Sequence, residues 1–580
     1  MINIKDHKTR PMFDPWQHLG TKRRKMLDQS WAGIFQQLIL PELPVNKIAS
    51  YFNDRVGRPS KELTTVIGTL LLQQYHDLTD EQTVEHLAFN IQWHYALNIP
   101  EESEQIKYIS PKTLWTMRQR MIECDIDLTV FEKVCSKLAE VFKVDTRLQR
   151  IDSVHVRSNM RRLGRISIFT QTIHKFLINL RRHHRDLYQG VCAMIRQRYC
   201  KHSALSCFAN VRPNEAAKTL RQVSEDLVEL VCQFETHEAV CSMHSYKLIK
   251  RVLDEQCQVS ADGQQISIKP SKQISSDSVQ NPSDPDAGYS STKGQGYQVQ
   301  LMETYSTTAD AKQKDQQLDL ITYIKVEKAC LSDTQALVPA IENTQKRDLA
   351  PCQLTGDALY GSDGNFVQAK QRSVSLVAPT LGTETSAKMG LSNFVLARNG
   401  KMLSCPAGYA PLMTKKNKGR FTVGFCADTC AHCPIVGSCP VRTGKHYYYL
   451  HYDERASRVS RRRRKEQSIG FIEKYRWRAG IEATISQYDR RTGVKRQRYR
   501  GENKIRFAAV LKAAGLNILR AAAVARARRA AKQQVDKVRF RPDLASIYVK
   551  ELWVTLINHL CLIFISRWTA VDYDDLKIAV

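Results

Sequence analysis

The chain has 580 residues, enough for roughly four average domains or for one large domain with insertions. Hydrophobic residues make up 42% of it, so a sizeable core can form, and 87 Lys and Arg against 58 Asp and Glu give a formal net charge of +29. This charge exceeds what solubility requires and indicates a polyanionic partner, with nucleic acid as the first candidate.

An anionic membrane surface is the alternative partner for so basic a chain. The N-terminal MINIKDHKTRPMFDPW is charged and has no apolar signal core. The most apolar run, Leu552 to Ile565, is only about 14 residues long and contains Asn558 and His559, so it predicts a buried helix and not a membrane span. Sixteen cysteines in a large chain without an export signal are expected to be reduced. We therefore expect a cytoplasmic protein with no membrane partner.

The segment from Arg55 to Arg120 has the apolar spacing of short helices, and its ISPKTLWTMRQRM begins with a Ser-Pro helix cap. Several short helices with Arg and Lys on their polar faces predict a DNA-binding region similar to a helix-turn-helix. An ordinary helical bundle with a solvated basic face explains the same pattern.

The period then changes at LQRIDSVHVRSN, Leu148 to Asn159, where β-branched residues predict a strand that carries Asp152. Residues 166–259 return to a helical pattern, and the polar SKQISSDSVQNPSDPDAGYSSTKGQ predicts an exposed loop. After this loop we expect two strands in GYQVQLMETYS and LDLITYIKVEKAC, a helix in DTQALVPAIENT, and one strand each in QLTGDALYGS and SVSLVAPT. The pattern predicts an α/β fold.

Asp357 directly follows the fourth of these strands, in LTGDALYGSDGN. An aspartate at such a place usually hydrogen bonds its own turn. However, an order of three strands, a helix, a strand, a helix and a strand is that of a ribonuclease H-like sheet, in which the first and fourth strands are neighbours. This sheet would bring Asp152 and Asp357 together in one metal site.

A helix is predicted around Glu482 in YRWRAGIEATISQYDRRTGVKRQRYRG, because Tyr475, Arg478, Glu482, Ser486 and Asp489 have helical spacing and share one face. Basic residues surround this face: Arg476, Arg490, Arg491, Lys495, Arg496, Arg498, Arg500, Lys504 and Arg506. A carboxylate in a basic surface suits phosphodiester chemistry, since cations hold the backbone while the acid holds a metal. An exposed helix whose Arg478 and Glu482 simply pair is the alternative.

The chain resembles the DDE transposases of bacterial insertion sequences, in particular the group with a Tyr-Arg-Glu motif. The resemblance runs from Arg55 to Arg520 and is carried by IDSVHVRSN, SDPDAGYSSTKGQGYQVQ, TGDALYGS and the stretch around Glu482. It implies a ribonuclease H-like mixed-sheet core with a helical N-terminal domain and insertions. At Asp489 the family motif usually has a lysine, so no catalytic role is assigned to this residue.

The resemblance also implies a function. The protein would bind the ends of its own insertion sequence and catalyse metal-dependent DNA cleavage and strand transfer. Asp152, Asp357 and Glu482 would be catalytic and would hold two Mg²⁺ or Mn²⁺ ions, with Asp152 bridging them. The expected partner is double-stranded DNA, as element ends and as target, bound by a homodimer in a bacterial cytoplasm. DNA contacts are expected from Tyr475, Arg478, Arg490, Arg491, Lys495, Arg496, Arg498 and Arg500. A non-catalytic DNA-binding remnant and a metal-dependent nuclease with the same core are the alternatives.

Between Thr380 and Lys465 the sheet pattern breaks, which predicts an insertion. Its FCADTCAHCPIVGSCP contains four closely spaced cysteines, Cys426, Cys430, Cys433 and Cys439. In a reducing compartment this spacing predicts a structural Zn²⁺ site, with Cys405 as an alternative ligand and His432 as a weaker one. Chance clustering or a redox role would explain the same cysteines. SRRRRK, residues 460–465, is expected to be solvated and to contact phosphates.

These features divide the sequence into consecutive parts. We expect a helical N-terminal DNA-binding region (1–145), a first part of the ribonuclease H-like core (146–165), a helical insertion and linker (166–285), a second part of the core (286–380), a Cys-rich insertion (381–465), the catalytic Glu helix with a basic region (466–525) and a C-terminal helical region (526–580).

Overall fold

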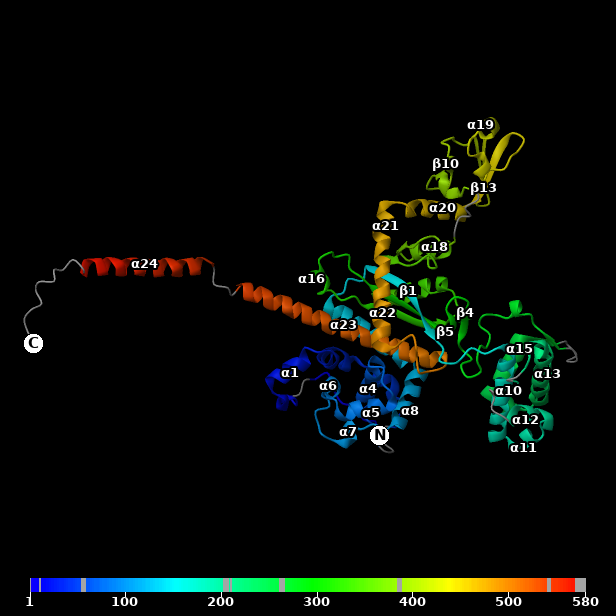
Figure 1. Cartoon of the computed structure of the whole chain (residues 1–580), viewed down its shortest axis with the longest axis horizontal. Coiled ribbons are helices and arrows are strands. Elements are labelled where there is room, and N and C mark those ends of the chain that lie inside the picture. Colours follow the sequence, from blue (N-terminus) through cyan, green and yellow to red (C-terminus); the bar gives the residue numbers. More distant parts are fainter. Residues whose placement is uncertain are drawn as a thin grey trace, which may run out of the picture.

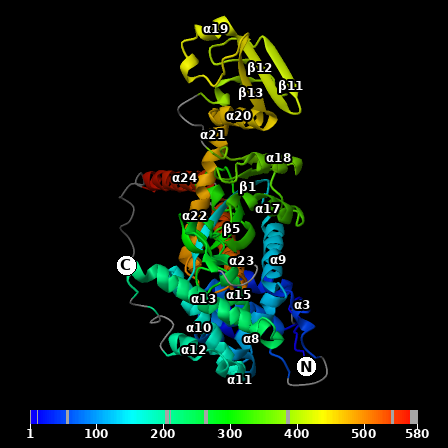
Figure 2. The same ribbon diagram turned by 90° about the vertical axis from the view of Figure 1, so that its right-hand side faces the viewer.

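The computed structural model describes residues 2–9, 12–53, 59–201, 208, 211–259, 266–382, 389–539 and 544–568. One mixed sheet lies among helices at the centre, and a helical unit and a β-rich unit project from it (Figure 1, Figure 2). Residues 55–58 of the expected N-terminal helical pattern lie outside the described residues.

The central sheet contains the five expected strands. They are β1 (Leu148–Arg157), β5 (Gly294–Thr304), β6 (Ile321–Lys328), β7 (Gln353–Thr355) and β8 (Ser375–Val377). β1 pairs antiparallel with β5 and parallel with β7, β5 pairs antiparallel with β6, and β7 pairs parallel with β8. The spatial order β6-β5-β1-β7-β8 makes the first and fourth strands neighbours, and the expected ribonuclease H-like α/β fold is confirmed.

Both faces of the sheet are covered by helices. On one face Ile151 of β1 packs in a core with residues of α17 (Leu337–Gln345) and α18 (Asp363–Gln371). On the other face Val154 and Val156 share a core with α22 (Gly480–Thr492) and α23 (Glu502–Arg539). Because β1 is covered on both sides, its polar residues between these apolar ones need partners inside the protein.

The N-terminal helices belong to the same core as the sheet, because α23 packs against α4, α9 and β6. These helices are α1 (Gly20–Asp28), α2 (Trp31–Ile34), α3 (Val45–Ala49), α4 (Leu63–Tyr75), α5 (Asp80–Phe89), α6 (Ile91–Ala96), α7 (Glu104–Lys107), α8 (Pro111–Glu123) and α9 (Ile126–Phe142). The expected cap is present, since Ser110 accepts a hydrogen bond from the Thr113 amide at 3.2 Å. Arg118 was expected on a solvated face, but it is buried and forms an ion pair with Asp80.

The expected helical pattern of residues 166–259 is also found, as a unit with its own core around Phe169, Phe176 and Phe234. Its elements are α10 (Arg165–His183), α11 (Arg185–Gln189), α12 (Ala193–Cys200), α13 (Ala216–Phe234), α14 (Glu238–Cys241), α15 (His244–Gln256), β2 (Cys257–Val259) and β3 (Ile266–Ile268).

The polar segment after this unit is not the exposed loop that its composition predicts. It contains the edge strand β4 (Gly288–Ser290), and Val279 and Asp284 within it are buried. Asp284 accepts hydrogen bonds from Ser158 Oγ at 2.5 Å, Tyr297 Oη at 2.6 Å and the Gly501 amide at 2.9 Å. These partners satisfy the buried carboxylate, which is why so polar a segment can pack inside the protein.

A β-rich subdomain, residues 389–453, lies between β8 and the helices that carry Glu482. It consists of β9 (Val395–Leu396), β10 (Met402–Ser404), β11 (Met413–Asn417), β12 (Arg420–Cys426), α19 (Ala427–Ala431) and β13 (Tyr447–Asp453). α20 (Glu454–Glu466) follows and contains the arginine run expected to be solvated. That expectation is wrong for Ser460 and Arg462, which are buried. Arg462 donates to the Ala378 carbonyl at 3.3 Å and lies over the Phe366 ring, so the apolar and carbonyl groups below α20 hold it.

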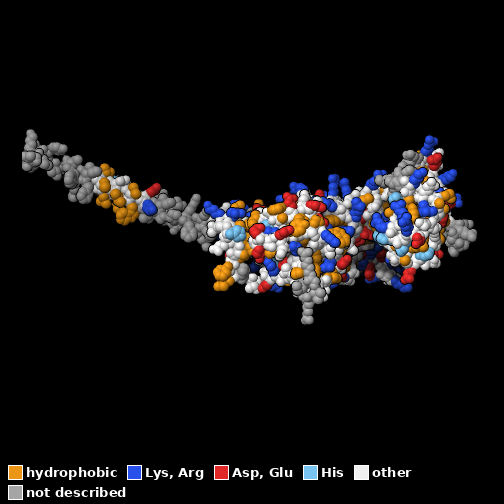
Figure 3. All heavy atoms as spheres, turned by 90° about the horizontal axis from the view of Figure 1, so that it is seen from below, with side chains coloured by type: hydrophobic (Ala, Val, Ile, Leu, Met, Phe, Trp, Pro, Cys, Tyr) orange, Lys and Arg blue, Asp and Glu red, His pale blue; other side chains and the backbone are white. Residues whose placement is uncertain are grey.

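The apolar run near the C-terminus forms a helix, α24 (Leu544–Trp568), but its described side chains are not buried as predicted. Leu552 and Trp553 are 63% and 61% exposed. The reason is that α23 carries the chain away from the body before α24 begins (Figure 1). The apolar side chains of α24 are therefore exposed to solvent (Figure 3). A different stretch, Glu502–Gln534, is long and apolar enough to cross a membrane, but 83% of its most apolar window is buried, as in the core helix of a folded domain.

Candidate active site

The three predicted catalytic acids come from three elements that lie near one another around the middle of β1. Asp152 lies in the middle of β1 and is 7% exposed, Asp357 lies in the loop between β7 and α18, and Glu482 lies in the first turn of α22. Burial raises the pKa of Asp152 to about 6, and the charges of Asp357 and Glu482 add to the rise. The acids are therefore near enough to repel one another, although they are far apart along the chain.

Arg478 lies between two of these acids. Its Nη2 donates to Asp152 Oδ2 at 2.6 Å, and its Nη1 lies 3.3 Å from Glu482 Oε1. The Arg478 charge therefore lowers the Asp152 pKa, but not enough to cancel the effect of burial. Tyr475 is close by: burial raises its pKa, Arg478 lowers it, and Asp357 and Asp152 raise it further. Tyr475, Arg478 and Glu482 thus lie around Asp152, although they do not share one continuous helix as predicted, because a 3₁₀ turn carries Arg478.

Asp357 makes the turn contact usual for its position and also lies near Asp152. Its Oδ1 accepts a hydrogen bond from the Leu359 amide at 2.9 Å, which is the turn contact usual for an aspartate after a strand. The same carboxylate lies close enough to raise the pKa of Asp152. The turn contact therefore orients an acid that faces the Asp152 carboxylate.

The helix that carries Glu482 is docked on β1 by a close contact with Arg150. α21 (Ile469–Tyr475), the 3₁₀ turn Arg476–Ala479 and α22 follow one another directly (Figure 1). Arg150 Nη1 donates to the Trp477 carbonyl at 2.9 Å. A Cβ atom on Gly480 would lie 2.0 Å from this Nη1 atom, so a larger residue there would have to displace the Arg150 guanidinium. Since Arg150 and Asp152 are on the same strand, this contact fixes Glu482 relative to Asp152.

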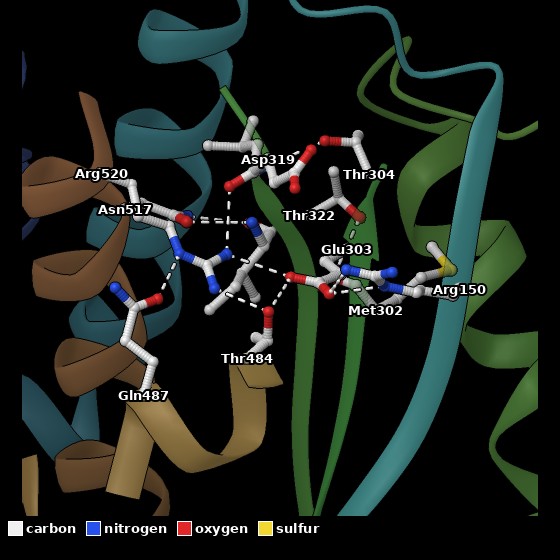
Figure 4. A network of polar contacts seen from close by, with 12 residues as sticks. Arg150, Met302, Glu303, Thr304, Asp319, Thr322, Thr484, Gln487, Asn517 and Arg520 are labelled. Atoms are coloured by element: carbon white, nitrogen blue, oxygen red, sulfur yellow. Dashed lines mark hydrogen bonds and ion pairs between the residues drawn. The ribbon is translucent and has the colours of Figure 1, made fainter. Parts of the chain in front are cut away.

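A buried ion-pair network fixes the other side of the same helix (Figure 4). Glu303 of β5 is fully buried and accepts hydrogen bonds from Arg150 Nε at 2.7 Å, Arg520 Nη1 at 3.0 Å and Thr484 Oγ1 at 2.7 Å. It thereby ties β1, α22 and α23 to one strand. The sequence analysis missed this residue, although a lone glutamate in the otherwise uncharged strand GYQVQLMETYS was a signal.

Two family models match the chain. One, described as a transposase DDE domain, matches residues 404–522, and the other, described as a transposase domain, matches residues 27–120. The two matches support a DDE transposase of an insertion sequence. The comparison with curated proteins found no match. The first range contains Glu482 and most of the β-rich subdomain, and the second covers most of the N-terminal helices. Asp152 and Asp357 lie outside both ranges, so the geometry of the sheet is what associates them with Glu482.

The expected DNA-binding residues of this transposase fall into two groups. Several are exposed and lie at or just after the end of α22: Arg490, Arg491, Lys495 and Arg496. Arg498 instead donates to the carbonyl and carboxylate oxygens of Asp77 at 2.7 and 3.3 Å. The exposed side chains of the first group can contact a phosphate backbone. Arg498 also holds the basic segment, residues 490–500, on the N-terminal helices.

The basic segment runs beside the end of β1. The Arg157 amide donates to the Lys495 carbonyl at 3.0 Å, and Arg500 Nε donates to Asn159 Oδ1 at 2.9 Å. Asp489 accepts a hydrogen bond from the Lys495 amide at 3.0 Å, so its carboxylate closes the turn that follows α22. Exposed arginines thus continue from the acidic site along the strand end.

A lysine that the sequence analysis missed contacts Ser153, the residue after Asp152. Lys293, in the turn between β4 and β5, donates to Ser153 Oγ at 3.3 Å and is exposed. Ser153 Oγ in turn donates to Asp333 Oδ2 at 3.2 Å. The turn sequence STKGQ was part of the segment that resembled the family, but nothing in it indicated that its lysine would reach β1.

The cysteines of the β-rich subdomain do not gather as the spacing predicts. Cys405, Cys430, Cys433 and Cys439 line one small cavity, whereas Cys426 is outside it. All cysteines that the structure describes are free thiols. Within the described ranges, no three His, Cys, Asp or Glu side chains already surround a common ion position, either here or around Asp152.

Proposed function

We propose that this transposase binds the ends of its own insertion sequence and catalyses metal-dependent DNA cleavage and strand transfer with Asp152, Asp357 and Glu482. The observation that supports the proposal most is the position of Arg478, which bridges Asp152 and Glu482 while Asp357 acts on the same carboxylate. A carboxylate such as Asp152, whose pKa is shifted by burial and by neighbouring charges, is typical of an active site.

The donor set suits a hard divalent cation. Carboxylate oxygens are the ligands that Mg²⁺ and Mn²⁺ prefer. Three acids share the single positive charge of Arg478, so the site has an excess of negative charge that a cation would balance. The arrangement with Arg478 between the acids is closed to an ion, and Arg478 has to leave Asp152 before the three carboxylates can act as ligands. Two bound Mg²⁺ or Mn²⁺ ions would supply Lewis-acid activation of the attacking hydroxyl and stabilisation of the leaving oxygen.

The chain's own residues would then hold the DNA. A released Arg478 presents a planar fork of donors, which matches two oxygens of a phosphate. Lys293 and the exposed arginines Arg490 and Arg491 extend the positive surface on either side of the acids. We further propose that the protein acts as a homodimer on DNA in the bacterial cytoplasm, because cutting and joining two element ends requires two sites.

The test is a cleavage and joining assay on duplexes that contain the sequences flanking the coding region. Asp152→Asn, Asp357→Asn and Glu482→Gln should each lower cleavage by on the order of 10²-fold or more, since an amide keeps the volume but loses the charge that holds the cation. DNA binding should be nearly intact in all three. Asp489→Asn is the matched control on the same helix and should cleave normally.

Each alternative gives its own result in this assay. Cleavage at wild-type rates in any of the three acid variants would remove that residue from the site. Wild-type protein that cuts but never joins would indicate a nuclease, and wild-type protein that binds the ends without cutting would indicate a non-catalytic remnant.

A further inference from the structure

Four cysteines of the β-rich subdomain line one cavity, Cys405, Cys430, Cys433 and Cys439. The cavity has a volume of ≈ 20 Å³, which is room for a single water-sized sphere. Apolar side chains, among them Phe425 and Val436, make up most of the remaining wall. A space of this size among thiols fits an ion and excludes an organic ligand.

Two tight turns bring the thiols to the cavity. In the first, the Gly408 amide donates to the Cys405 carbonyl at 2.9 Å, and Gly408 adopts a φ of 89° that favours glycine. In the second, the Cys433 amide donates to the Cys430 carbonyl at 3.2 Å. Cys-x₂-Cys turns of this kind supply pairs of ligands in structural zinc sites.

The thiols are close enough to affect one another's ionisation. Burial raises the pKa of Cys430 to about 11, and the neighbouring thiols of Cys439, Cys405 and Cys433 add to the rise, with Cys426 contributing last. Burial also raises the pKa of Cys439, again with Cys405 and Cys433 adding to it.

The two other candidate ligands do not line the cavity. Hydrogen bonding to Thr429 lowers the pKa of Cys426, so this thiol interacts with the first turn of α19. His432 is exposed, and its Nδ1 lies 2.8 Å from the Asp428 carbonyl oxygen. Cys405, from a turn distant in the sequence, thus lines the cavity in place of Cys426, which the spacing predicts as a ligand.

The β-rich subdomain has little else to stabilise it. Its core consists of seven buried side chains, Phe394, Met402, Phe421, Val423, Phe425, Leu450 and Tyr452. Units with so small a core are usually held by disulfides or by a structural metal. Since the described cysteines here are free thiols, a structural metal is the remaining one of these two ways to stabilise the subdomain.

We propose that Cys405, Cys430, Cys433 and Cys439 bind one structural Zn²⁺ ion. Four thiolates suit Zn²⁺, whereas the carboxylate site suits Mg²⁺ or Mn²⁺, so the two sites select different metals. The described thiols do not yet surround a common point, and they turn toward the cavity when the ion binds. The proposal does not depend on the DNA chemistry proposed above.

Elemental analysis of the full chain, purified under reducing conditions without chelator or metal-affinity resin, tests the site. We expect close to one zinc per chain. Cys405→Ser should remove the zinc and make the β-rich subdomain sensitive to protease. Cys426→Ser, the matched control, should retain both the zinc and the protease resistance, which separates the set of cysteines in the fold from the set that the spacing predicts.

A second measurement covers the case in which Cys405→Ser fails to fold. Wild-type protein and Cys426→Ser exchanged into Co²⁺ should both show the visible absorption of tetrahedral cobalt and intense thiolate-to-cobalt charge transfer. Zinc-free protein whose β-rich subdomain resists protease would overturn the proposal. Loss of zinc in Cys426→Ser with retention in Cys405→Ser would overturn it as well.

Discussion

Arg478 donates a hydrogen bond to Asp152 at 2.6 Å, although the two residues lie 326 positions apart. Without bound metal, the guanidinium thus supplies the positive charge that the buried carboxylate needs. A cation that enters the site competes with Arg478 for the same oxygen. In the proposed mechanism, the pair would therefore couple metal binding to the release of Arg478.

Arg478→Gln should destabilise the metal-free protein by about 1–3 kcal/mol, because Asp152 loses its charge-assisted hydrogen bond. Added Mg²⁺ should restore more stability in this variant than in the wild type, since the ion no longer has to displace a guanidinium. Thermal unfolding in EDTA and in Mg²⁺ measures both effects. Arg490→Gln, at an exposed residue of the following helix α22, is the control and should change stability by less than about 0.5 kcal/mol. Identical unfolding of Arg478→Gln and wild type in EDTA would contradict this role of Arg478.

Glu303→Gln should cost about 3–5 kcal/mol of stability, because the buried guanidinium groups of Arg150 and Arg520 would lose the carboxylate with which they form ion pairs. DNA cleavage should fall too, since Glu303 helps to position the helix that carries Glu482. Thr484→Val removes only one hydrogen bond to the same carboxylate and should cost about 1 kcal/mol. The graded loss can be followed by thermal unfolding together with the cleavage assay. Equal effects of the two variants would show that the Glu303 charge is unimportant.

Much of the central sheet could be predicted because each main strand has a local signal. Asp152 was placed on a strand by the β-branched residues around it, and strand order then placed Asp357 beside it. β4 was missed since it is short and lies in a Ser- and Asp-rich segment. Its burial depends on Asp284, whose partners Tyr297 and Gly501 belong to other elements. Local composition carries no information about such distant partners.

The side chains that support the site were harder to predict. A charged residue in a strand is usually predicted to face solvent. The sequence around Glu303 therefore did not indicate that Arg520 of α23 would form an ion pair with it. Spacing along the chain favoured Cys426 over Cys405, because a distant turn leaves no local pattern. The apolar composition of α24 was sufficient to predict a helix, but burial depends on what packs against the helix.

Asp319 provides a prediction of pH dependence. Burial raises its pKa to about 6, and the charge of Glu303 adds to the rise. With an unfolded pKa of about 3.9, the folded state binds more protons between about pH 4 and 6, so this residue lowers stability as the pH rises through that window. Asp319→Asn removes the effect and should be more stable than wild type by up to about 3 kcal/mol at pH 7, with the gain vanishing below about pH 4. Urea unfolding of both proteins across this pH range measures the difference in their free energies of unfolding. A difference that stays constant with pH would contradict this role of Asp319.

The net charge of +29 predicts that DNA binding depends steeply on salt. With six or more phosphate contacts, affinity for any duplex should fall by about 10³ or more between 50 and 200 mM salt. Replacing both Arg490 and Arg491 by Gln should reduce the slope of log K against log salt by about 2, because each exposed arginine releases about one counterion. Arg498→Gln is the comparison, and its smaller effect on the slope would follow from the ion pair with Asp77. Fluorescence anisotropy titrations of a random-sequence duplex measure the slopes, and a flat dependence in the wild type would point to a protein or membrane partner instead of DNA.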